Sequence, residues 1–171
     1  MNYFSAPHKS TEYMTVFQLF IDMEKRRVLQ VGDGNQVMTT TTLQDIGSIV
    51  AEALEYPHPW PRVGGISGTT MKFADYVKLA ERITGDSFAI EKLDPKDLEK
   101  GELNSSWCPQ IEHQNVPPEI AAQVSKGAIA EIMDALVKRA WHVSDEWNKA
   151  LPQYKMTTAE EFFKKYWETK K

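Results

Sequence analysis

Two glycine-rich segments are the first places in this sequence where residue type and spacing could do chemistry. Gly32-Asp33-Gly34 follows a short apolar run, as a dinucleotide-binding turn would, but Val37 stands where the third glycine belongs. The run Gly64-Gly65-Ile66-Ser67-Gly68 has neither that spacing nor the lysine of a phosphate loop. We interpret the first as a tight turn and the second as a close packing contact between a strand and a helix. An anion site at the helix start after Gly68 is the alternative.

Three titratable residues are candidates for acid–base chemistry: Tyr13, Glu112 and His113. Cys108 precedes the last two, yet one Cys and one His do not make the three or four donors that zinc requires, so we predict no metal site. Trp107 and His113 lie in an irregular, aromatic segment, 101–118. They fit the wall of a substrate pocket, and an ordinary ordered loop is the simpler interpretation.

Composition places the chain among ordinary globular proteins. Its 171 residues are 42% hydrophobic and 26% charged, with a formal net charge of -4, which fits a single domain, 1–171. The mild acidity argues against a nucleic-acid partner. Cys108 is the only cysteine, so no internal disulfide is possible. With no apolar run long enough to span a bilayer and no targeting segment, we expect no membrane association and a cytoplasmic protein.

Hydrophobic periodicity predicts an α/β fold of few short strands with about five helices. Helical patterns are expected over 10–25, from Thr42 to Leu54, from Thr70 to Gly85, over 95–98, from Pro118 to Ala140 and from Thr158 onward. Strands are expected at 28–31, 37–41, 63–66 and 88–90. The helix that begins at Thr42 is expected to bury one apolar stripe, formed by Leu43, Ile46, Ile49, Val50, Ala53 and Leu54.

Several segments together resemble the NmrA-like and isoflavone-reductase-like proteins of fungal type, an atypical branch of the short-chain dehydrogenases and reductases. Val31-Gly32-Asp33-Gly34-Asn35 is similar to the family's Gly-Asp-Gly turn, and Thr42-Leu43-Gln44-Asp45-Ile46 to the helix start that follows it. Ile66-Ser67-Gly68, the helix around Phe73–Tyr76 and the closing run 157–162 are similar to later parts of the family. The resemblance covers most of the chain.

The resemblance implies the C-terminal, substrate-side portion of an NmrA-like Rossmann-type fold. In the family, a front half that this chain does not display carries the NADP(H)-binding turn and the catalytic residue, so no cofactor is expected for the isolated chain. Asn2, Tyr3 and Phe4 resemble the Asn-x-Phe segment that faces the nicotinamide in the family. That placement makes Tyr13, Phe17 and Phe20 a further part of the expected substrate pocket.

Three functions follow as hypotheses. The first is the substrate-binding portion of an NADP(H)-dependent oxidoreductase, not competent alone and with a small-molecule substrate. The second is a non-catalytic regulatory module that binds another protein. The third is a cofactor-independent isomerase or cyclase that uses the aromatic pocket. A fold without its front half would expose an apolar face, so we expect a homodimer or a partner chain to cover it.

Overall fold

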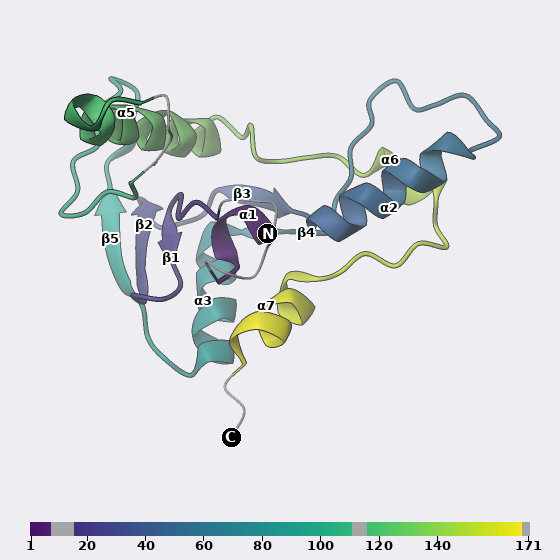
Figure 1. Cartoon of the computed structure of the whole chain (residues 1–171), viewed down its shortest axis with the longest axis horizontal. Helices are drawn as coiled ribbons and strands as arrows, with labels where there is room; N and C mark the ends of the chain where they lie inside the picture. The colour runs from purple at the N-terminus through teal and green to yellow at the C-terminus, as the bar shows by residue number, and fades with distance from the viewer. Residues whose placement is uncertain (8–15, 111–115, 169–171) are drawn as a thin grey trace.

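The computed structural model describes residues 1–7, 16–110 and 116–168 of the chain, a mixed α/β arrangement (Figure 1). Among these residues lie seven helices and five short strands, which confirms the predicted class. The elements in chain order are α1 (Asn2–Ser5), β1 (Ile21–Asp22), β2 (Arg27–Val31), β3 (Val37–Thr40), α2 (Leu43–Leu54), β4 (Thr69–Lys72), α3 (Phe73–Thr84), β5 (Ala89–Leu93), α4 (Pro95–Leu98), α5 (Pro118–Val137), α6 (Glu146–Ala150) and α7 (Ala159–Trp167).

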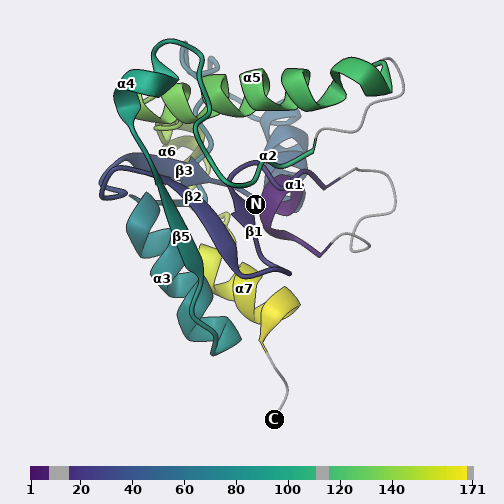
Figure 2. The same cartoon turned by 90° about the vertical axis from the view of Figure 1, so that its left-hand side faces the viewer.

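The strands form two small sheets. In the first, the order is β1-β2-β5: β1 runs antiparallel to β2, and β2 runs parallel to β5 with Val28 opposite Ile90. The second is the antiparallel pair β3–β4, in which Thr39 lies opposite Thr70. Helix α5 lies on one side of the sheets, and α3 and α7 lie on the other (Figure 2). Helices α2 and α6 lie together at the far end of the β3–β4 pair (Figure 1).

Two apolar clusters match this division. The main core surrounds the three-stranded sheet and includes Phe20, Phe73, Tyr76 and Phe163, all almost fully buried. Burying an aromatic or aliphatic side chain of this size contributes about 1.5–3 kcal/mol. A second, smaller cluster joins α2 to α6, and its buried members are Ile49, Ala53, Trp147 and Leu151. The α2–α6 end therefore has its own modest core.

Local signals in the sequence placed several elements correctly. The Gly-Asp-Gly segment is a turn in which Gly32 and Gly34 have φ of 51° and 69°, values that glycine adopts without strain. Gly85 ends α3 with φ of 77°, and Pro95 is the first residue of α4. Thr158 and Glu161 form a capping box at the start of α7, where the sequence predicted a helix to begin.

The helix predicted over 10–25 is wrong for the described part of that range. Residues 16–20 have no helical structure, Ile21–Asp22 is β1, and Ile21 pairs with Val28. Val16, Leu19, Phe20, Ile21 and Met23 are all buried. A segment that is buried on all sides satisfies a helical spacing and a buried-strand pattern equally well, so periodicity could not separate them.

The predicted strand 63–66 and the helix start at Thr70 are also wrong. Strand β4 comes later, at Thr69–Lys72, and α3 begins at Phe73. The backbone N–H groups of Gly65 and Ser67 donate to the side chains of Glu146 (3.1 Å) and Asn148 (2.9 Å). Because side chains of α6 satisfy this backbone, the segment needs no neighbouring strand.

The apolar stripe of α2 is not buried as predicted. Only Ile49 and Ala53 of the stripe face the small core. The other four side chains are exposed, namely Leu43 (46%), Ile46 (38%), Val50 (51%) and Leu54 (72%). The sequence identified an apolar helix face, but in this chain nothing among the described residues covers it.

Helix α5 buries Ile129, Met133 and Leu136 in its second half, whereas Ile120 and Val124 near its start are exposed. None of the described helices combines the length and apolar content needed to cross a membrane.

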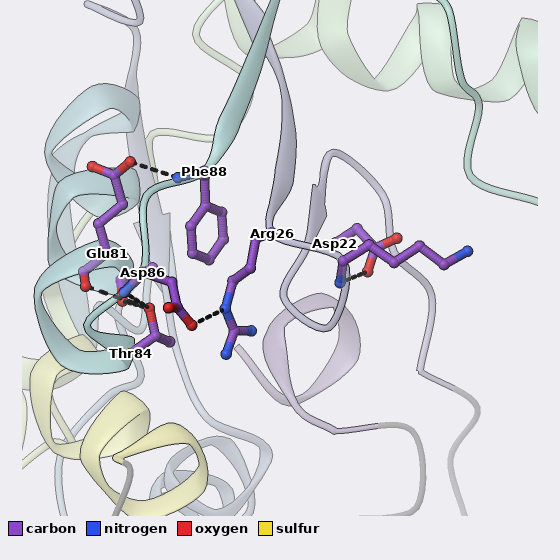
Figure 3. Close-up of polar contacts among 8 residues, drawn as sticks. Asp22, Arg26, Glu81, Thr84, Asp86 and Phe88 are labelled. Atoms are coloured by element: carbon purple, nitrogen blue, oxygen red, sulfur yellow. Dashed lines mark hydrogen bonds and ion pairs between the residues drawn. The ribbon is translucent and has the colours of Figure 1, made fainter.

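Polar contacts close the turn between β1 and β2. Arg26 has a left-handed φ of 53°, and its Nε donates to Asp86 Oδ2 at 3.1 Å, which ties the turn to the loop after α3 (Figure 3). Asp22 is buried, and its carboxylate accepts from the backbone N–H of Lys25 (3.0 Å) and from Arg27 Nε (3.0 Å). These contacts fix the register of the first sheet.

Candidate functional site

An aromatic junction forms where α1 meets the segment before β1. The backbone N–H of Phe17 donates to the carbonyl oxygen of Tyr3 at 2.8 Å, so the two segments are joined directly. The rings of Tyr3 and Phe17 lie 5.0 Å apart, and those of Phe4 and Phe20 lie 4.9 Å apart. With Asn2, the structure thus brings together five of the residues that the sequence suggested for a cofactor and substrate site.

Asn2 connects this junction to the start of α2. Its buried side chain accepts from the backbone N–H of Leu43 at 3.0 Å and donates to Gln44 Oε1 at 3.2 Å. The first N–H groups of a helix have no partner within the helix, so this contact satisfies one of them. Gln44 was not predicted, although its place in the first turn after Thr42 was a usable signal.

The two aromatic pairs differ in exposure. Phe4 and Phe20 belong to the main core, where Phe20 also packs against Phe73 (5.2 Å). Tyr3 is 43% exposed and Phe17 is half-buried, so only these two rings offer surface to a ligand. Burial raises the pKa of Tyr3 above its ordinary value, so its hydroxyl keeps the proton and can donate a hydrogen bond.

Trp107 lies in a different environment from the junction. Its ring stacks on the Arg27 guanidinium, 4.1 Å from the ring centre. Both residues line a shallow groove of about 310 Å³, together with Glu91 and Ser106. Glu91 accepts two hydrogen bonds from Ser106 in this groove. None of the residues of the aromatic junction lines this groove.

The three acid–base candidates, Tyr13, Glu112 and His113, lie outside the described residues. Cys108 is half-buried, and burial raises the pKa of its thiol, which disfavours the nucleophilic thiolate. In the described parts of the chain, no three His, Cys, Asp or Glu side chains group as metal ligands.

The glycine segment 64–68 makes close packing contacts, as the sequence suggested, but they are not contacts between a strand and a helix. A Cβ on Gly65 would lie 2.3 Å from the Ser144 carbonyl oxygen, and one on Gly68 would lie 2.6 Å from the Thr40 carbonyl oxygen. The Gly68 N–H donates to Thr41 Oγ1 at 3.1 Å. The segment's N–H groups at positions 65, 67 and 68 are therefore occupied by protein atoms.

No site was expected from the sequence at the other end of α2. An open groove of about 760 Å³ lies there, between the last turn of α2 and the end of α6. Glu52, Glu55, Tyr56, His58 and Lys149 contribute its polar and aromatic lining. Two acids in a helix's last turn, followed by an aromatic and proline-rich run, were the signal that could have indicated it.

Comparison with known proteins relates the chain to oxidoreductases. It is 22% identical over 174 aligned residues to the oxidoreductase swnN of Metarhizium robertsii, an alignment that covers 99% of this chain and 50% of that protein. A solved structure, AtPrR2 in apo form, matches 83% of this chain and 44% of its own, with a TM-score of 0.56 and 14% identity. No family profile matches the chain.

These likenesses define an α/β domain that is distantly related to a fungal oxidoreductase. The chain spans about half the length of the curated relative it matches. The structural likeness, at 14% identity, shows a similar fold and nothing further.

Proposed function

We propose that the chain is the substrate-side part of an NmrA-like, NADP(H)-dependent reductase. The observation that carries the proposal is the alignment of nearly the whole chain with one half of a fungal oxidoreductase. Polypeptide other than these residues, in the same chain or in a separate chain, would supply the dinucleotide-binding half.

The aromatic junction is the site we assign to that function. Asn2 holds α1 against the start of α2, which fixes the direction of Tyr3. Tyr3 and Phe17 then offer two adjoining ring surfaces and one hydroxyl donor to a flat ligand, either the nicotinamide or an aromatic substrate.

The glycine segments support the expectation that the isolated chain binds no dinucleotide. A pyrophosphate site needs free backbone N–H groups at a helix start. The Gly34 N–H donates to the Val31 carbonyl oxygen, and those of Gly65, Ser67 and Gly68 are occupied.

The test joins this chain to the half of swnN that it does not match. We expect the isolated chain to bind no NADPH up to millimolar concentration in calorimetry, and the folded fusion to bind it in the micromolar range. In the fusion, Tyr3→Leu should weaken binding of NADPH or substrate about 3- to 10-fold, the worth of one ring contact. Trp60→Leu, an exposed aromatic change on the α2–α6 end, should have no effect.

Micromolar NADPH binding by the isolated chain would contradict the proposal. So would a fusion that has a cooperative unfolding transition yet binds no NADPH, because the chain would then not complete such a reductase.

A regulatory, protein-binding function is the second candidate, and the exposed stripe of α2 favours it. Four large apolar side chains on one helix face are unusual for an isolated monomer. A second copy or a partner chain would cover them. We expect wild-type protein to associate with increasing concentration in sedimentation velocity, and Val50→Gln to remain monomeric. A cofactor-free isomerase or cyclase based on Tyr13, Glu112 and His113 stays a prediction.

A further inference from the structure

The groove at the C-terminal end of α2 has the dimensions of a small-molecule site. Its volume is about 760 Å³, within the range of roughly 300–1,000 Å³ typical of ligand pockets. One wall is the last turn of α2 with the following 56–58 segment, and the other is the end of α6 with residues 151–153. It lies at the opposite end of α2 from Asn2, so a ligand here would be independent of the proposed reductase function.

The charges along the α2 wall destabilise the C-terminal end of the helix. Glu52 and Glu55 occupy the last turn and the C-cap, and the last turn carries no basic residue. The C-terminal end of a helix is the negative end of its dipole, so carboxylates there are unfavourable and cations are favourable. Gln153 Nε2 donates to Glu52 at 3.0 Å, while the Glu55 carboxylate has no hydrogen bond or ion pair within the described residues. The groove therefore has an uncompensated negative wall.

Lys149, the one lysine or arginine among the described residues that line the groove, is already engaged. Lys149 Nζ lies 2.7 Å from Oδ1 of Asp145, the N-cap residue of α6. This ion pair offsets the Lys149 charge locally. It leaves the carboxylates of α2 as the net charge that a ligand would meet.

Aromatic rings stand beside the carboxylates. The rings of Tyr56 and His58 line the groove and meet edge to face, with centres 5.3 Å apart. Tyr56 in turn packs against Trp147 of the small core, with centres 5.5 Å apart. The aromatic wall is therefore held by buried structure. Aromatic faces attract organic cations through the ring quadrupole.

We propose that this groove binds a small organic cation, an alkylated or protonated amine. Glu52 and Glu55 would supply the countercharge, the end of α2 would add its dipole, and Tyr56 and His58 would contact the alkyl groups around the nitrogen. Such a cation would relieve the unfavourable charges at the helix end, so binding should also stabilise α2.

The test compares choline with its neutral carbon isostere, 3,3-dimethyl-1-butanol. Trp147 and Trp60 adjoin the Tyr56 wall, so tryptophan fluorescence reports occupancy and calorimetry confirms it. We expect saturable choline binding in the millimolar range, at least about tenfold tighter than the alcohol, as a cation–π and charge contribution of about 1.4 kcal/mol requires.

Variants that remove a negative or a positive charge from the groove distinguish charge-dependent choline binding from unspecific binding. Glu55→Gln should weaken choline binding about threefold, the scale of an exposed charge pair, and Lys149→Met should tighten it. Glu24→Gln, an exposed acid elsewhere on the chain, should change nothing. Equal affinity for choline and the alcohol would overturn the proposal, as would variants at Glu55 and Lys149 that both bind like wild type. A thermal midpoint no lower than that of wild type for each variant rules out unfolding as the cause.

Discussion

Asp45 joins the start of α2 to the segment that leads into α7, and replacing it should destabilise the whole chain. The side chain is buried. Its Oδ2 accepts from Thr42 Oγ1 (2.6 Å) and from the Thr157 N–H (3.1 Å). Its Oδ1 accepts from the Tyr154 hydroxyl (3.0 Å) and from Thr157 Oγ1 (3.1 Å). Four donors thus converge on one carboxylate.

The arrangement of donors sets the magnitude for Asp45→Asn. The new amide nitrogen cannot face the Thr157 N–H, which only donates, so it must take the Oδ1 position, where both hydroxyls can turn to accept. All four contacts then persist but lose their charge assistance. Charged hydrogen bonds contribute about 1 kcal/mol more than neutral ones, and relief of carboxylate desolvation offsets part of the loss, so we expect a cost of about 2–3 kcal/mol. Asp45→Ala leaves buried donors unpaired and should cost about 4 kcal/mol or more.

Urea unfolding followed by tryptophan fluorescence measures this difference. With a slope of roughly 2 kcal/mol per M, Asp45→Asn should lower the midpoint by about 1–1.5 M. Glu52→Gln is the matched control on the same helix, because its one hydrogen bond is exposed and its loss should cost under about 0.5 kcal/mol. If Asp45→Asn unfolds within 0.3 M of wild type, or costs more than Asp45→Ala, the assignment of this carboxylate as the junction between the segments is wrong.

Two further predictions concern pH and glycine packing. A hydrogen bond from Lys164, as its main cause, lowers the pKa of Glu160 from 4.5 to about 2. The resulting stability is present above pH 4.5 and is lost as the pH falls toward 2, so Glu160→Gln should show a smaller loss of thermal midpoint over that window, a difference that 0.5 M salt should shrink. Gly65→Ala would place a Cβ 2.3 Å from the Ser144 carbonyl oxygen and should destabilise by at least about 2 kcal/mol. Gly47→Ala, inside α2 with open space around it, should stabilise by up to about 1 kcal/mol in the same urea assay.

The parts of the fold that the sequence predicted best are those set by local chemistry. The glycines at 32, 34 and 85 occupy positions of positive φ, which glycine adopts without the steric strain that a Cβ would cause. Thr158 and Glu161 cap a helix through contacts three residues apart. Such features depend on neighbours in sequence, so no tertiary knowledge was needed to find them.

The errors occur where distant segments decide the local structure. Ile21 is a strand residue because β2 lies beside it, and the segment around Gly65 is irregular because α6 satisfies its backbone. The junction of Tyr3 with Phe17 followed from the family resemblance and from short separation. The contact of Trp107 with Arg27 could not be predicted from the sequence, because only the fold brings these two residues together.

Helix α2 is where the predicted burial of an apolar stripe differs most clearly from the structure. The sites proposed for this chain lie at its two ends and on its exposed face. An apolar stripe in a sequence records that a face is suited to burial, not which polypeptide covers it. Here Ile49 and Ala53 use the part that faces α6, while Val50 and Leu54 remain exposed. The relative that aligns with this chain has as much polypeptide again beyond the aligned half. The uncovered face of α2 is the surface that the proposed second body of polypeptide would cover.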